Sequence, residues 1–278
     1  MRKIIQPRLS ENVIAQISGI PYKTVPYWYG AAARALYLDL LLPKQAEFRK
    51  ELPVIVWACG GAFSQMDRNV WLPSMIDFAK AGYAVASIDY RTAPVYPFPA
   101  AVEDIRAAVR FLRANSAQYG LDPNRIVSMG ESAGGYLACM AALAGSEYDV
   151  GEHLDQPSGV QAVVDFYGKI DFSKAGKDEG CNDLVNSLFL NGRRDAAFLN
   201  AIACKNLVDA NTCPMLIFHG AEDPLVPLVE SEELYQSLCD CGVRSDLYVL
   251  EGAGHGEDVF YQPEIRRIIL NFLNEVLS

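Results

Sequence analysis

The sequence predicts an α/β protein built on a doubly wound, mostly parallel sheet. Short apolar runs recur along the chain, and several are continuous rather than alternating, as in strands buried on both faces. Stretches with helical periodicity lie between them, which indicates βαβ crossovers. The chain has 278 residues, of which 51% are hydrophobic. This is enough to bury a sizeable core, so we expect a single domain over residues 1–278.

Seven segments have the composition of buried strands. They are rich in β-branched, aromatic and other apolar residues and are bounded by turn-forming residues. The predicted strands cover residues 35–43, 53–59, 83–90, 125–131, 161–168, 214–220 and 245–252.

Helices are predicted between these strands. The clearest begins just after Pro99 and ends at Gly120. Its apolar positions recur every three or four residues and form one stripe for burial. The positions of that stripe are Val102, Ile105, Val109 and Leu112. Residues 230–242 and 263–277 show a similar period.

Two segments fit this alternation poorly. Residues 1–34 are rich in aromatics towards their end, and we expect this N-terminal segment near the functional site, with Trp28 and Tyr29 as candidate covers of its entrance. Residues 169–212 form a long connection with room for one or two short helices. Long insertions in compact domains are usually lids or binding loops, so we predict a small cap here.

Charge and composition exclude several classes of function. The formal net charge is −10 and the pI about 4.8, so the protein should repel phosphate backbones, and nucleic acid is not an expected partner. No apolar run reaches the length of a membrane span, and Pro7, Arg8 and Glu11 interrupt any signal-peptide core.

The seven cysteines are scattered and odd in number, which predicts reduced thiols and a cytoplasmic location. Cys239 and Cys241 lack further ligands nearby, so no metal site is predicted. A homo-oligomer is compatible with these features.

The stretch from Gly130 to Gly134 reads G-x-S-x-G and follows the predicted strand 125–131. At such a strand-to-helix turn the backbone lifts the serine hydroxyl out, here that of Ser132. The serine then lies at a helix N-terminus, where free N–H groups favour developing negative charge. The position between a strand and an apolar helical run is the context that the motif requires.

A serine nucleophile needs a base, and the chain has three histidines. His255 lies in a glycine-rich loop after the last predicted strand, from which an imidazole could reach back to Ser132. His153 lies in a polar loop, and His219 at a strand end has the pattern of a structural histidine. His255 is therefore the predicted base.

The base in turn needs an acid to fix its tautomer. Asp223 follows the penultimate strand and is the predicted acid, whereas its neighbour Glu222 should point elsewhere and Asp258 lies on the wrong side of the His255 loop. The chain order Ser132, Asp223, His255 is that of α/β-hydrolases.

From about residue 35 onward the chain resembles the hormone-sensitive-lipase-like group of α/β-hydrolase esterases, with its small bacterial acetylesterases and carboxylesterases. The motifs that carry the resemblance are "DYRTAPVYPFPAAVEDIRAAVRFL" at 89–112, "GESAGG" at 130–135, "HGAEDPLVP" at 219–227 and "GAGHG" at 252–256. The resemblance implies an α/β-hydrolase fold and ester hydrolysis through an acyl-serine. It also implies no cofactor and no metal.

That group usually carries H-G-G-G or H-G-G-A where this chain has Cys59-Gly60-Gly61-Ala62. The resemblance implies an oxyanion hole made by the backbone N–H groups of Gly61, Ala62 and Ala133. Cys59 replaces the usual histidine, and we interpret it as a buried supporting residue, because a free cysteine is usually a small core hydrophobe. The histidine's hydrogen bonds must then be replaced by other groups.

The residues after this loop should border the site. Phe63, Met66 and Trp71 are candidate wall residues for the acyl or alcohol group, and Gln65 or Asp67 is a candidate for binding a sugar hydroxyl. Ordinary packing and a solvated turn are an equally good interpretation of these positions. Glu131, beside the nucleophile, has the pattern of a structural hydrogen-bonding residue rather than of an acid catalyst.

These features predict a serine carboxylesterase acting on small soluble esters. Short acyl groups are expected, with acetylated or hydroxycinnamoylated carbohydrates as a possible substrate class. One alternative is a serine peptidase of the prolyl-oligopeptidase type, although these usually read G-x-S-Y-G-G, and here Ala133 stands in the place of the tyrosine. The other alternative is a non-catalytic binding protein on a hydrolase scaffold.

Overall fold

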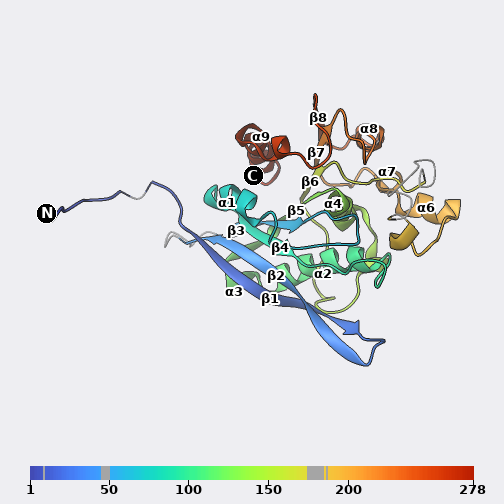
Figure 1. The fold of residues 1–278 in the computed structure, drawn as a ribbon, viewed down its shortest axis with the longest axis horizontal. Coiled ribbons are helices and arrows are strands. Elements are labelled where there is room, and N and C mark those ends of the chain that lie inside the picture. Colours follow the sequence, from blue (N-terminus) through green and yellow to red (C-terminus); the bar gives the residue numbers. More distant parts are fainter. Residues whose placement is uncertain (9, 45–50, 174–184, 186) are drawn as a thin grey trace.

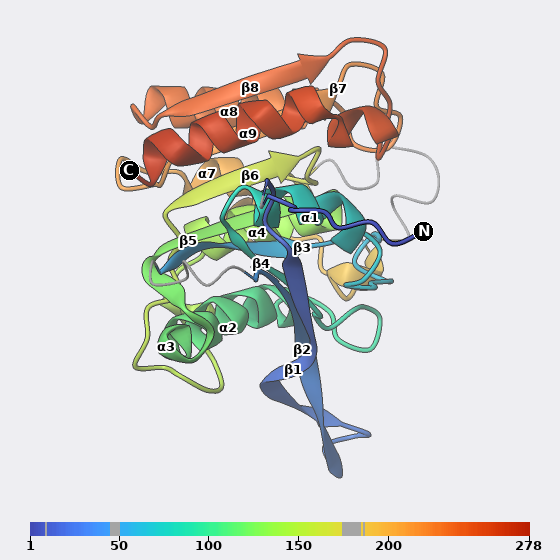
Figure 2. The ribbon, with the colours of Figure 1, turned by 90° about the vertical axis from the view of Figure 1, so that its left-hand side faces the viewer.

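The computed structural model describes residues 1–278 except 9, 45–50, 174–184 and 186. The described strands form one eight-stranded sheet in the order β1-β2-β4-β3-β5-β6-β7-β8. Figure 2 shows this order from β8 at the top to the β1–β2 hairpin at the bottom. The predicted fold class, a doubly wound and mostly parallel sheet, is confirmed.

Six strands run parallel and form the centre and one edge of the sheet. The central ones are buried on both faces, which explains their continuous apolar sequences. The parallel strands are β3 (Leu52–Ala58), β4 (Ala84–Ile88), β5 (Leu121–Glu131), β6 (Ala162–Phe166), β7 (Met215–Gly220) and β8 (Ser245–Leu250).

Helices cover both faces of the sheet (Figure 1). Buried side chains of α1 and α9 pack in one apolar cluster, and those of α2, α4 and α8 pack in another. The α-helices are α1 (Leu72–Lys80), α2 (Ala100–Ala114), α3 (Ser116–Tyr119), α4 (Ala133–Leu143), α6 (Ala196–Ile202), α7 (Cys204–Leu207), α8 (Val229–Asp240) and α9 (Pro263–Val276). Two short 3₁₀ helices are η1 (Ser146–Tyr148) and η2 (Asp258–Tyr261).

The helix predicted after Pro99 forms with its apolar stripe fully buried. It is divided into α2 and α3 at Asn115, whose side-chain amide donates to the carbonyl of Phe111. The second part ends at Gly120, which has the left-handed conformation (φ 68°) that glycine adopts at helix ends.

The largest difference from the prediction lies in the N-terminal segment. Residues Ile14–Tyr27 form the long strand β1, which pairs antiparallel with β2 (Ala32–Pro43). β2 in turn runs antiparallel to β4. The turn end of this hairpin projects beyond the rest of the sheet in both views (Figures 1 and 2).

The described residues can be compared with three sequence predictions, which concern membrane spans, metal sites and cysteines. Among the described residues, no helix is long and apolar enough to cross a membrane. The same residues contain no group of three or more potential metal-ligating side chains. The cysteines that the structure describes are free thiols, while Cys181 lies outside the described residues.

Candidate active site

The turn between β5 and α4 raises Ser132 at the carboxyl edge of the sheet. Ser132 has φ 55° and ψ −117°, a strained conformation for a residue with a side chain. Its N–H donates to the carbonyl of Phe166 on β6, at 2.9 Å. A Cβ at Gly134 would collide with the carbonyl of Ala58, so helix and strand can approach this closely only with glycine there. This is the geometry of a nucleophile elbow.

The structure brings Ser132, His255 and Asp223 together from three different strand ends. Nε2 of His255 lies 2.9 Å from Oγ of Ser132, and Nδ1 lies 2.6 Å from Oδ2 of Asp223. The carboxylate can only accept, so Nδ1 carries the proton and Nε2 is free to take one from the serine hydroxyl. The arrangement can activate a serine for attack on a carbonyl carbon.

Asp223 is held as a carboxylate. Its Oδ1 accepts the N–H groups of Leu225 and Val226, at 2.8 and 2.9 Å. Burial favours the neutral acid, but the hydrogen bonds from His219 and His255 outweigh it and hold the pKa of Asp223 well below its usual range. The group therefore stays ionised and can orient the imidazole and stabilise its charged form.

The other two histidines have structural surroundings. His219 is fully buried, and its Nε2 donates to the carbonyl of Val226 at 2.9 Å while Nδ1 lies 2.7 Å from Oγ of Ser231. His153 lies in a turn, with its ring against the edge of Phe111. Neither of them lines the cavity at Ser132.

The loop after β3 contributes Ala62 and Phe63 to the cavity wall at Ser132, whereas Gly61 does not line that cavity. Gly61 has φ 131°, and a Cβ there would collide with the carbonyl of Gln65. Ala62 and Phe63 also have positive φ, of 55° and 57°. The N–H groups of Gly61, Ala62 and Ala133 make no hydrogen bond to another described residue. Such free donors beside a nucleophile could stabilise an oxyanion.

The anchors of this loop replace the histidine that the resemblance leads one to expect at position 59. The phenol of Tyr90 donates to the backbone carbonyl of Cys59, at 2.7 Å. The thiol of Cys59 is buried, and burial raises its pKa to about 12. A neutral thiol is a poor nucleophile, which agrees with a supporting role for Cys59.

Glu131 is the second anchor of the loop. Its Oε1 accepts the backbone N–H of Gly60 and, at 3.2 Å, the indole N–H of Trp71. Burial raises the pKa of Glu131, against the effect of these two donors. Trp71 is itself fixed by stacking on Tyr261, with ring centroids 4.2 Å apart.

A cavity of about 70 Å³ adjoins the nucleophile. Lys169 lies in its wall, and its Nζ is paired with Oε1 of Glu230 at 2.5 Å. Sequence reasoning did not find Lys169, and the only available signal was its place just after β6. The lining residues are Ala62, Phe63, Ser132, Ala133, Lys169, Val185, Leu225, Val226 and His255.

The predicted wall residues Phe63, Met66 and Trp71 and the predicted sugar-binding residue Gln65 have different surroundings. Phe63 lines the cavity at Ser132 and stacks on Phe189, with ring centroids 3.9 Å apart. Met66 lines a separate hollow beside β2, Trp71 supports Glu131, and Gln65 is exposed and lines neither space.

The structure describes the two residues predicted to cover the entrance, but only part of the predicted cap. Trp28 and Tyr29 lie at the hairpin turn and do not line the cavity at Ser132. The cap over 169–212 falls partly on residues outside the described ones and stays a prediction. Its described part contributes Lys169 and Val185 to the cavity wall.

Two curated relatives from Mycobacterium tuberculosis are similar in sequence. Esterase LipC is 31% identical over 241 residues, or 82% of this chain and 59% of LipC. Esterase LipQ is 28% identical over 251 residues, or 88% of this chain and 58% of LipQ. The chain thus spans less than two thirds of the length of these relatives.

Solved structures and a family model extend the comparison. A truncated form of a carbohydrate esterase from gut microbiota superposes with a TM-score of 0.80 at 26% identity, over 94% of this chain and 95% of that one. Its likeness agrees with the α/β-hydrolase fold that the strand order, the elbow and the loop positions indicate. The model described as BD-FAE matches residues 38–238, which is most of the chain, and the protein therefore belongs to the BD-FAE family.

Proposed function

We propose that this protein is a serine carboxylesterase that hydrolyses small carboxylic esters. The observation that carries the proposal is the hydrogen-bonded series from Ser132 through His255 to Asp223. A cavity adjoins it, and free N–H groups face it. The similarity to esterases named as such in sequence and structure supports the same reaction class.

The mechanism follows from the positions of the polar atoms. Nε2 of His255 takes the hydroxyl proton as Oγ of Ser132 attacks the ester carbonyl. The N–H groups of Gly61, Ala62 and Ala133 stabilise the resulting oxyanion. The imidazolium then gives its proton to the leaving alcohol. Water, activated by the same imidazole, releases the acid from the acyl-serine.

The size of the cavity favours a short acyl group. Its volume is about 70 Å³, against about 550 Å³ for the hollow beside β2. An acetyl group needs less of so small a space than a hydroxycinnamoyl ring does. Within the predicted substrate class we therefore favour acetyl esters. The carbohydrate esterase among the similar structures supports a sugar as the alcohol.

The proposal predicts that Ser132→Ala loses at least about a thousandfold in kcat/KM on 4-nitrophenyl acetate, because removing a serine nucleophile removes the covalent route. Cys59→Ala is the matched control and should keep most of the activity, since its neutral thiol takes no part. Steady-state kinetics with the acetate, a longer acyl ester, methyl ferulate and a proline-containing anilide measure both the reaction and its range.

Each competing function has its own outcome in this assay. Turnover of the anilide without turnover of any ester would favour the peptidase. Absence of all turnover in the wild type would favour a binding protein. Loss of activity in Cys59→Ala as complete as that in Ser132→Ala would return the thiol to the mechanism.

A further inference from the structure

Two hollows larger than the catalytic cavity lie along the β1–β2 hairpin. The strand hollow, of about 550 Å³, has walls that include Arg34, Tyr37, Met66, Asp89 and Tyr90. The turn hollow, of about 430 Å³, has walls that include Tyr27, Trp28, Tyr29, Val95 and Tyr96. Neither of them takes part in the chemistry at Ser132.

The two hollows adjoin at Arg34. This side chain lines the strand hollow, and its guanidinium carbon lies 5.5 Å from the ring centre of Tyr27 and 5.3 Å from that of Tyr96. Both rings line the turn hollow. Tyr96 is fixed further by a hydrogen bond from its phenol to the carbonyl of Pro26, at 2.9 Å. We call the two hollows together the hairpin groove.

The turn presents large aromatic side chains where the backbone disfavours them. Trp28 and Tyr29 have φ of 48° and 55°, and the N–H of Gly30 donates to the carbonyl of Tyr27 at 3.2 Å. Both residues lie in a four-residue loop between the paired residues Tyr27 and Ala32, and positive φ is uncommon for residues with bulky side chains. Their side chains stay 69% and 103% exposed. A local rule broken in this way, with no gain in burial, is typical of a functional surface.

The hairpin groove is connected to the oxyanion loop by direct contacts. Tyr90, in the wall of the strand hollow, donates to the carbonyl of Cys59. The segment that carries Val95 and Tyr96 is joined to the same loop through the N–H of Ala93, which donates to the carbonyl of Phe63 at 2.8 Å. The groove therefore begins where the loop that faces Ser132 ends.

The small catalytic cavity makes such a surface useful. At about 70 Å³ it is several times smaller than the two hollows along the hairpin, so we expect a large alcohol part of an ester to extend beyond it. A sugar ring has an apolar C–H face, which can stack on an aromatic ring, and an edge of hydroxyl groups. Arginine and carboxylate groups can bond those hydroxyls. The hairpin groove offers both kinds of partner, and the net charge of −10 favours a neutral sugar over an acidic one.

We propose that the hairpin groove binds the neutral oligosaccharide chain that carries the ester cleaved at Ser132. The proposal deepens the proposed esterase function and rests on it. The aromatic rings of the turn hold distal sugar units, and the strand hollow leads the chain towards the oxyanion loop. Substrate length would then affect binding rather than the chemical step.

The test replaces the turn by the residues that its backbone favours. The double variant W28N/Y29G removes both rings and should keep the hairpin folded, because asparagine and glycine tolerate the positive φ of these two positions. We expect the kcat/KM ratio of acetylated xylohexaose to 4-nitrophenyl acetate to fall at least about fivefold, through KM for the oligosaccharide. The control Tyr248→Thr removes a half-exposed ring from β8, on the other edge of the sheet, and should leave the ratio unchanged. An unchanged ratio in W28N/Y29G would overturn the proposal.

A direct binding measurement separates this proposal from the esterase proposal. Calorimetry on the Ser132→Ala protein with unsubstituted xylohexaose, and with mannohexaose as a second probe, needs no turnover. Binding that is weakened at least about fivefold by W28N/Y29G supports the groove, even if the wild type hydrolyses no ester. Binding of neither probe overturns it, even if 4-nitrophenyl acetate is cleaved. Sedimentation that shows a wild-type dimer and a monomeric W28N/Y29G would assign the aromatic turn to self-association instead and would also overturn it.

Discussion

At the scale of single residues, Glu131 joins the two halves of the candidate site. It directly precedes the nucleophile, and its carboxylate accepts the N–H of Gly60 in the loop that faces Ser132. Trp71, stacked on Tyr261, donates to the same oxygen. Glu131 therefore sets the position of the oxyanion donors relative to Ser132, the next residue in the chain.

We predict that Glu131→Gln lowers kcat on 4-nitrophenyl acetate by about ten- to a hundredfold with little change in KM. The amide oxygen of glutamine can accept the same two N–H groups but carries no negative charge, so both hydrogen bonds weaken and the loop is held less firmly where the oxyanion forms. Losing an oxyanion donor outright costs about 10²–10³ in rate, and a displaced one should cost less. Steady-state kinetics give the split between kcat and KM.

The control for this prediction is Glu222→Gln, an exposed glutamate that also neighbours a triad member. It should behave as the wild type. Thermal unfolding of both variants shows whether the fold has changed. A Glu131→Gln protein whose KM rises while kcat is unaffected would contradict a positioning role.

The chemistry-bearing residues were predictable where a local motif carries them. G-x-S-x-G and the glycine-rich loop at His255 are short patterns whose backbone requirements appear in the sequence. The contact from Glu131 to Gly60 spans 71 positions, and no local pattern marks it. Lys169 was equally hidden, because a single lysine after a strand has no distinguishing sequence context. Contacts of this kind depend on packing rather than on spacing.

At the scale of elements, the parallel strands were predictable and β1 was not. Strands buried on both faces give continuous apolar runs, whereas β1 lies at an edge and alternates between buried and exposed residues. It also contains Gly19, Pro21 and Pro26, which normally argue against a strand. Register shifts between Ile17 and Ile20 and between Pro21 and Lys23 accommodate Gly19 and Pro21, while Pro26 pairs regularly with Ala33 near the end of the strand.

The element β6 carries a buried acid with a pH-dependent effect on stability. Asp165 is fully buried, Oδ1 accepts the N–H of Gly168 at 3.0 Å, and Oδ2 has no hydrogen-bond partner among the described residues. Burial raises the pKa of Asp165 to about 7. In the unfolded chain its pKa is about 3.9. Between these two values the folded protein holds a proton that the unfolded chain releases.

We predict that Asp165 makes the free energy of unfolding decrease as the pH rises from about 4 to about 7, and that this contribution levels off above about 7. The slope is at most about 1.4 kcal/mol per pH unit for one proton. His219, whose pKa is also raised, acts in the same direction at higher pH, so the comparison must be with Asp165→Asn. Urea unfolding of both proteins from pH 5 to pH 8 gives their free energies of unfolding. The value for the wild type should fall relative to that for Asp165→Asn up to about pH 7. A difference between the two proteins that does not change with pH would contradict the prediction.

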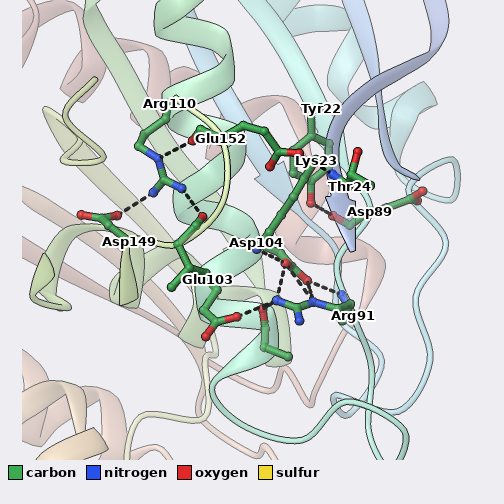
Figure 3. A network of polar contacts seen from close by, with 12 residues as sticks. Tyr22, Lys23, Thr24, Asp89, Arg91, Glu103, Asp104, Arg110, Asp149 and Glu152 are labelled. Atoms are coloured by element: carbon green, nitrogen blue, oxygen red, sulfur yellow. Dashed lines mark hydrogen bonds and ion pairs between the residues drawn. The ribbon is translucent and has the colours of Figure 1, made fainter. Parts of the chain in front are cut away.

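At the scale of the whole molecule, buried ion pairs connect the projecting β1–β2 hairpin to α2 (Figure 3). Nζ of Lys23 on β1 lies 2.7 Å from Oδ1 of Asp104 on α2, and both side chains are buried. Arg91, in the segment that leads to Tyr96, binds the same carboxylate and that of Glu103. Further along α2, Arg110 pairs with Asp149. The orientation of the hairpin relative to the oxyanion loop is thus fixed by charge as well as by strand pairing.

We predict that Lys23→Met lowers the free energy of unfolding by about 3 kcal/mol. Removing one partner of a buried ion pair leaves an incompletely compensated charge, which costs about 3–5 kcal/mol. Arg91 still neutralises part of Asp104, so the lower end applies. The matched control is Lys80→Met, whose partner is the exposed Glu11 and whose loss should cost less than about 1 kcal/mol. Urea unfolding measures the loss in both variants.

Equal losses in free energy of unfolding in the two variants would mean that the Lys23–Asp104 ion pair adds nothing to the strand pairing of β1 with β2. In that case Asp104→Asn should leave the penalty of Lys23→Met unchanged in a double-mutant cycle, whereas a buried pair requires that penalty to shrink.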